Sequence, residues 1–239
     1  MLQTSYILLF VILFGIILTY YNTTMKRLNI DKKVRLKIIV FVLSISILWL
    51  SYIAIITNSQ ILLDRSLPPK IPLLIIAPLF LFTGIFLYRN RHSRILHTIP
   101  FYLPIAYQSF RAVIEILFYF SYLKGWYPIE VTFEGSNYDI LLGLSAPIIA
   151  LYAYKKADSE KSFKCLIYWN IIGLIVVGNA AFTFITTFYF PSVWGANESL
   201  MSNEFLTFPL LLLPAFFMPS AIFMHILSII QLRKKCFSK

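Results

Sequence analysis

Three polar residues share one face of a predicted apolar helix, in the segment QSFRAVIEILF at positions 108–118. At 100° per residue, Gln108, Arg111 and Glu115 fall within about 80° of one another around the helix axis. An amide, a guanidinium and a carboxyl group arranged in this way could bind a small polar or amphiphilic solute, or relay protons. The alternative is a structural ion pair, because Arg111 and Glu115 have the i to i+4 spacing at which opposite charges can neutralise each other.

The composition of the chain places these charges in a membrane protein. Hydrophobic residues make up 59% of the 239 residues and charged residues only 13%, with a mean hydropathy of +0.78, whereas soluble domains carry about 25% charged residues. Ionisable groups near the bilayer centre cost about 2.5 to 3.5 kcal/mol each on insertion scales, so they almost always face a bundle interior or a water-filled cavity. This polar face is therefore the leading candidate site.

Long apolar runs supply the helices that would position this site. A helix needs about 20 apolar residues to cross the hydrocarbon core. We predict an all-α, single-domain bundle of seven transmembrane helices over residues 6–21, 37–57, 71–88, 99–123, 139–154, 165–190 and 205–232. Pro78 and Pro104 are expected to bend the third and fourth helices, and Pro209, Pro214 and Pro219 to break the regularity of the last.

The distribution of basic residues predicts the orientation of the bundle. Most of the 21 lysines and arginines lie between the first and second, third and fourth, and fifth and sixth predicted helices, and in the tail at Arg233, Lys234, Lys235 and Lys239. Because short basic loops stay in the cytoplasm, we expect the amino terminus outside and the carboxyl terminus inside, in the plasma membrane. Contact with anionic lipid headgroups then accounts for the net charge of +11, and no nucleic-acid partner is predicted.

Further polar residues could extend the candidate site. Asn179 lies near the middle of the sixth predicted helix, at about the depth of Arg111, where an interhelical hydrogen bond is possible. The outer segment at 124–140 is expected to fold back over the mouth of the bundle, and its Glu130, Glu134 and Asp139 could bind a cation or a cationic solute. Acidic residues on an outer loop are, however, often simply solvated.

No motif points to a metal, a cofactor or a catalytic centre. The sequence has no HExxH, CxxC, GxSxG, P-loop or GxGxxG pattern. His225 is the only histidine within a predicted helix, and we expect it to be hydrogen-bonded or interfacial, since zinc would need three or four ligands at recognisable spacing. Close helix contacts are expected at small residues such as Gly173, Gly178, Ala180 and Ala181, with tolerated lipid-facing positions as the alternative for the glycines.

The sequence supports three hypotheses about function. The first is binding or transport of a small polar or amphiphilic solute or a lipid through Gln108, Arg111 and Glu115, with help from Asn179. The second is an intramembrane enzyme on a lipid-like substrate, with Glu115 as acid or base and Arg111 holding an anionic group. The third is a sensory or assembly subunit that acts through a partner protein. The lack of a catalytic cluster favours a role without catalysis.

Overall fold

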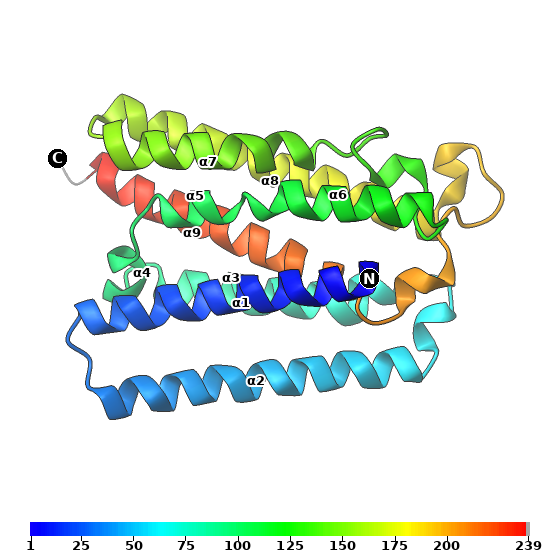
Figure 1. Cartoon of the computed structure of the whole chain (residues 1–239), viewed down its shortest axis with the longest axis horizontal. Helices are drawn as coiled ribbons and strands as arrows, with labels where there is room; N and C mark the ends of the chain where they lie inside the picture. Colours follow the sequence, from blue (N-terminus) through cyan, green and yellow to red (C-terminus); the bar gives the residue numbers. More distant parts are fainter. Residues whose placement is uncertain (238–239) are drawn as a thin grey trace.

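Long apolar helices dominate the computed structural model, which describes residues 1–237. Five helices among these residues are long and apolar enough to cross a membrane: α1 (Leu2–Arg27), α2 (Lys32–Asn58), η2 with α3 (Pro72–Asn90), α8 (Glu160–Tyr189), and η6 with α9 (Leu213–Cys236). They run along a common direction in Figure 1. All regular secondary structure in the described part of the chain is helical, so the fold is an all-α bundle of the kind that a multi-pass membrane protein requires.

The predicted fourth helix, over residues 99–123, is not continuous. Two helices, α5 (Leu103–Tyr107) and α6 (Phe110–Leu123), follow one another along the bundle. Between them the backbone tightens, because the amides of Gln108, Arg111 and Ala112 bond to carbonyls three residues back and not four. The Ser109 hydroxyl also donates to the Ala106 carbonyl at 2.8 Å, which competes with regular helical bonding. The interruption therefore lies directly before Arg111 and not at Pro104.

The last predicted helix begins later than expected. Instead of starting at 205, the chain forms a short 3-10 helix, η5 (Asn203–Leu206), and an irregular segment around Pro209 before the π-helical turn η6 (Leu213–Phe217) leads into α9 (Met218–Phe237). The helix of α3 (Ala77–Asn90) starts in the same way, with the π-helical turn η2 (Pro72–Ile76). Prolines near the start of each helix remove backbone donors and disturb the α-helical pattern there.

The remaining elements connect or flank these helices. The predicted fifth helix is α7 (Asp139–Lys156), which starts at the expected residue and contains Pro147. Short helices occupy the connections: η1 (Ile61–Leu63), α4 (Arg94–Thr98), η3 (Ile129–Val131) and η4 (Pro191–Trp194).

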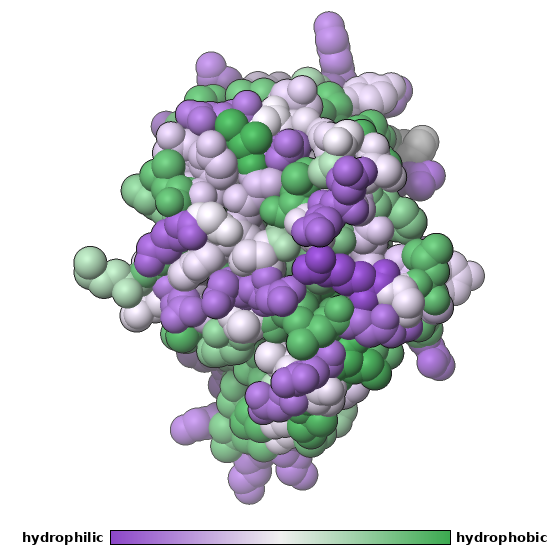
Figure 2. Space-filling view, turned by 90° about the vertical axis from the view of Figure 1, so that its right-hand side faces the viewer, coloured by the Kyte–Doolittle hydropathy of each residue, from purple (hydrophilic) through white to green (hydrophobic). Residues whose placement is uncertain are grey.

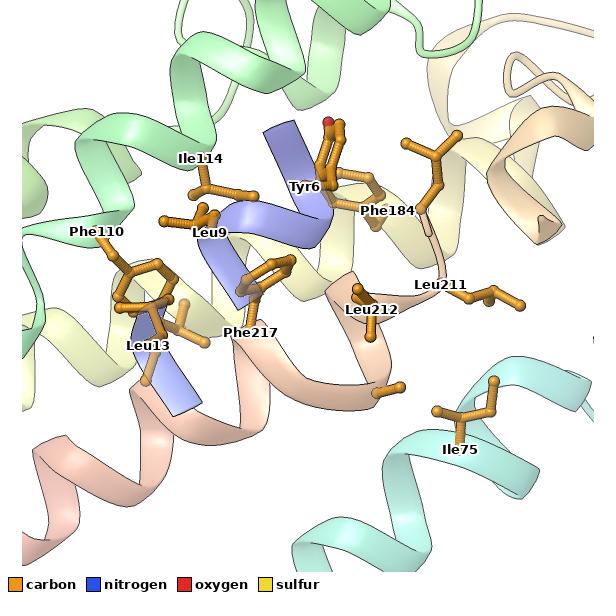
Figure 3. Close-up of a cluster of buried hydrophobic side chains, with 14 of the residues drawn as sticks. Tyr6, Leu9, Leu13, Ile75, Phe110, Ile114, Phe184, Leu211, Leu212 and Phe217 are labelled. Atoms are coloured by element: carbon orange, nitrogen blue, oxygen red, sulfur yellow. The ribbon is translucent and has the colours of Figure 1, made fainter. Parts of the chain in front are cut away.

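Helices α8 and α9 form the buried centre, and α2 lies at the edge (Figure 1). The apolar window of α2 is 6% buried, against 44% for α8 and 50% for the last helix. Tyr6, Leu9 and Leu13 of α1 lie near Phe110 of α6 and Phe217 of η6 in the cluster of buried side chains in Figure 3.

Two glycines allow close contacts between helices. A methyl group on Gly173 of α8 would overlap the imidazole ring of His225 on α9, and one on Gly143 of α7 would overlap the backbone of Ala112 on α6. The prediction of a close contact at Gly173 is confirmed. Gly178 is exposed, and a methyl group there would meet nothing within 4 Å, so no close contact forms at that residue and the alternative of an outward-facing position holds.

The two ends of the bundle differ in charge. The basic turns between α1 and α2 and between α7 and α8 lie at the same end as the last residues of α9, whereas the segments at 59–71, 124–138 and 190–212 lie at the other end (Figure 1). Figure 2 shows hydrophilic residues across the face of that second end. Lys239 of the basic tail lies outside the described residues.

Candidate functional site

The predicted polar face of residues 108–115 points into the bundle. The exposed fractions of Gln108, Arg111 and Glu115 are 0%, 1% and 0%, so the expectation that they avoid lipid is confirmed. They do not bind one another, however. Arg111 forms its ion pair with Asp139 at the start of α7, and the Glu115 carboxylate accepts a hydrogen bond from Asn137. The i to i+4 ion pair between Arg111 and Glu115 is therefore not formed.

Arg111 lies at the centre of a hydrogen-bonded cluster. Its Nη2 donates to Asp139 Oδ1, and its Nη1 lies 3.0 Å from His225 Nε2 and 3.5 Å from the Gly173 carbonyl oxygen. Its Nε has no hydrogen-bond partner, although it is buried. Three helices besides α6 thus supply partners for a single guanidinium group: α7, α8 and α9.

The hydrogen bonds around His225 determine its tautomer. The Asn170 Nδ2 amide donates to the Leu166 carbonyl at 2.8 Å and to the Ser228 hydroxyl at 3.0 Å, so its Oδ1 is the atom that faces His225 Nδ1 at 2.9 Å. Because Oδ1 only accepts, Nδ1 carries the proton, and Nε2 is left to accept from Arg111. The imidazole in this arrangement is neutral.

The segment before α7 folds back against the bundle and completes the cluster. Asn137 is 1% exposed. Its Nδ2 donates to Glu115 Oε1 at 2.6 Å and to the Val131 carbonyl at 3.1 Å, and its Oδ1 accepts from the Asp139 backbone amide at 3.2 Å. Asn137 therefore connects the Glu115 carboxyl group to the Arg111–Asp139 pair. Elsewhere in the same segment, burial raises the pKa of the Tyr127 phenol well above its ordinary value.

The other predicted site residues lie apart from this cluster. The Gln108 side chain donates to the Ala221 carbonyl at 3.0 Å, and that of Asn179 to the Ser136 carbonyl at 2.6 Å, so neither side chain bonds to the Arg111 guanidinium. Glu134 is exposed and Glu130 is partly exposed. Of the three acidic residues in the segment at 124–140, only Asp139 is part of the cluster. No group of three or more metal-ligating side chains occurs among the described residues.

Sequence reasoning missed three members of the cluster: Asn137, Asn170 and Ser228. It expected His225 to be hydrogen-bonded or interfacial, and both ring nitrogens are hydrogen-bonded, but it did not place His225 beside Arg111. The only signal in the sequence is the presence of uncommon polar residues in apolar runs, such as the single histidine in the last helix. That signal marks a residue as unusual, but it does not identify the partner that satisfies it.

An apolar cavity lies against the cluster. Arg111 and Asp139 are the two charged residues in its wall. The rest of the wall is apolar and aromatic and includes Phe110, Ile114, Phe184 and Phe217, which are labelled in Figure 3. Partly exposed residues complete the lining, among them Ile76, Ala181, Ile185 and Met218. The cavity therefore extends to the lipid-facing side of α8 and the π-helical turns.

Comparison with known proteins gives no relative. No protein-family model, curated protein or solved structure matches this chain. The chemistry of the site is accordingly the only guide to its role. An almost wholly apolar cavity in which one ion pair reaches the wall can enclose a lipid-like molecule and hold its polar end.

Proposed function

We propose that this multi-pass membrane protein binds a lipid-like or amphiphilic molecule in the cavity beside Arg111 and Asp139, and either retains it or passes it across the bilayer. The observation that carries the proposal is the combination of an apolar cavity with a buried ion pair in its wall. Sites for small molecules are mostly apolar and carry only a few polar groups. The partly exposed rim suits entry from the hydrocarbon region.

In this proposal the predicted site residues have different tasks. Arg111 contacts the polar end of the ligand, while Glu115 and Asn137 hold the outer segment so that Asp139 meets Arg111. Gln108 and Asn179 fix neighbouring backbone at Ala221 and Ser136. A proton relay has less support, because an arginine keeps its proton and would interrupt the chain.

The two other hypotheses also have less support from the geometry. An enzyme that used Glu115 as acid or base would need that carboxyl group at the cavity, but Glu115 is not among the lining residues. A sensory or assembly subunit would act through a surface for a protein partner, and the apolar outer faces of the helices suit lipid equally well.

We also propose that all seven predicted helices cross the plasma membrane, with the amino terminus outside. At 1.5 Å per residue, α7 is about 27 Å long, and α5 with α6 forms a comparable path (Figure 1). The hydrocarbon core is about 30 Å thick, so both lengths are adequate. The segregation of basic connections to one end supports this orientation.

The experiment that tests the binding proposal is native mass spectrometry of the protein purified from its own membrane. We expect a stoichiometric lipid-like mass on the wild type and its loss from Ala181→Phe, which fills the cavity rim. The matched control is Ile175→Phe on the same helix, where the side chain is 66% exposed to lipid, and this variant should keep the ligand. An empty wild-type protein, or equal retention by Ala181→Phe, contradicts the proposal.

A further inference from the structure

The charges around the cavity already balance without a ligand. Arg111 contributes one positive charge and Asp139 one negative charge to the wall, and they pair directly. His225, the next neighbour of Arg111, is neutral because Asn170 fixes the proton on Nδ1. An anionic ligand would add a buried negative charge beside Asp139 with no cation left to neutralise it, which low-dielectric surroundings strongly disfavour.

The cluster nevertheless offers one hydrogen-bond donor. Nη1 and Nη2 of Arg111 have partners in Gly173, His225 and Asp139, whereas the buried Nε–H has none. Buried polar groups are normally paired. Arg111 is 99% buried and is part of the cavity wall, so an oxygen on a molecule in the cavity is the partner that fits this donor.

The rest of the cavity wall favours a ligand with a large apolar part. Six phenylalanines contribute to the cavity wall, at positions 110, 118, 184, 188, 205 and 217. Aromatic side chains pack well against flat or branched hydrocarbon and offer no further hydrogen bonds. The partly exposed rim at Ile76, Ile185 and Met218 leaves room for a chain to continue into the bilayer.

We infer that the ligand is an uncharged, mainly hydrocarbon lipid with an oxygen that accepts a hydrogen bond, such as a long-chain alcohol, ketone or quinone, and not an anionic amphiphile. This inference rests on the proposed function, since it assumes that the cavity is a ligand site. It narrows the ligand class through the charge balance at Arg111 and Asp139 and the unpaired Nε of Arg111.

Two photoreactive probes with the same diazirine-bearing C16 chain test the inference, one ending in a hydroxyl and the other in a sulfonate. In the wild type we expect the alcohol to label cavity residues at least about tenfold more than the sulfonate, which corresponds to about 1.4 kcal/mol. Labelling at the cavity is identified by its loss in Ala181→Phe and its retention in Ile175→Phe.

A charge change supplies the second arm of the test. Asp139→Asn leaves Arg111 without its counter-ion, so the ratio of alcohol to sulfonate labelling should fall about tenfold or more relative to the wild type. If the sulfonate labels the wild-type cavity as well as or better than the alcohol, the inference is overturned while the binding proposal stands. If neither probe labels the cavity, the binding proposal itself fails. Should Asp139→Asn not fold, the wild-type ratio alone decides.

Discussion

The indole Nε1–H of Trp49 on α2 donates to the carbonyl oxygen of Ala215, 3.1 Å away. In a regular α-helix the amide four residues later would bond to this carbonyl, but that residue is Pro219, which has no N–H. The Tyr52 hydroxyl does the same for Leu74, at 3.1 Å, where the residue four positions on is Pro78. The least buried helix is therefore attached to the bundle where prolines have removed helical donors.

Removal of the Trp49 donor should destabilise the protein. We expect Trp49→Phe to lower the free energy of unfolding by about 0.5 to 1.5 kcal/mol, because the Ala215 carbonyl loses its donor while the aromatic ring is largely kept. The measurement is reversible unfolding in mixed micelles. Pro219→Ala restores a backbone amide at the right place, so Trp49→Phe should cost less in that background. An equal cost in both backgrounds would show that this hydrogen bond is not the cause.

A methyl group at Gly173 should be far more harmful than one at Gly178. Both glycines are on α8, but at Gly173 the new carbon would overlap the His225 ring, whereas at Gly178 it meets nothing within 4 Å. The ring cannot move aside easily, since Asn170 and Arg111 hold its two nitrogens. We expect Gly173→Ala to cost about 1 to 3 kcal/mol through overpacking.

Gly178→Ala is the matched control for this prediction. It should leave stability unchanged or raise it by up to about 1 kcal/mol, because alanine favours the helix more than glycine does. Thermal unfolding of both variants in the same detergent is sufficient. Similar behaviour of the two would mean that the contact between α8 and α9 is looser than the structure indicates.

The membrane topology can be tested with single cysteines. In a background of Cys165→Ser and Cys236→Ala, seven crossings with the amino terminus outside predict that a membrane-impermeant maleimide labels Asn197→Cys and Glu134→Cys on intact cells. Asn29→Cys should react only after the cells are opened. All three positions are exposed at the helix connections.

Labelling of the Glu134→Cys variant distinguishes seven membrane crossings from five. If α5, α6 and α7 did not cross the bilayer, the segment before α7 would lie on the cytoplasmic side, and Glu134→Cys would be protected like Asn29→Cys. Labelling of Asn197→Cys is expected in both cases and serves as the positive control. Labelling of Asn29→Cys on intact cells would reverse the proposed orientation.

Local patterns in the sequence predicted the parts of the fold that depend on neighbouring residues. Uniform apolar runs identified α1, α2, α3 and α8, and the spacing of polar residues placed Gln108, Arg111 and Glu115 on a buried face. The start of the last helix was wrong because Pro209 and Pro214 delay the start of the helix instead of breaking its regularity from within. Hydropathy alone does not distinguish these two effects.

The partners of the buried polar residues could not be predicted, because they depend on how distant segments pack. Asp139 is 28 residues from Arg111, and it reaches Arg111 only because Asn137 anchors the preceding segment to Glu115 and Val131. Helical spacing suggested Glu115 as the partner of Arg111, but that rule applies to exposed side chains on one helix. A buried arginine instead bonds to whichever neighbouring helices supply acceptors.

A double-mutant cycle separates the observed ion pair from the one suggested by helical spacing. Arg111→Met should lower the free energy of unfolding by about 3 to 5 kcal/mol, because it leaves the Asp139 carboxylate largely buried and unpaired. Asp139→Asn should also be costly, since Arg111 then lacks its counter-ion. The double variant removes both charges and should be clearly more stable than the sum of the single changes predicts, with a coupling energy of about 1 to 3 kcal/mol.

The same cycle with Glu115→Gln provides the contrast. The glutamine carbonyl can still accept the hydrogen bond from Asn137, so this change alone should cost less than about 1.5 kcal/mol. Its coupling to Arg111→Met should be small, because neither a hydrogen bond nor an ion pair joins these two side chains. Strong coupling at Glu115 and weak coupling at Asp139 would assign the ion pair to the helix-spaced partner. The charge balance on which the uncharged ligand class depends would then fail as well, since Asp139 would no longer neutralise Arg111 at the cavity wall.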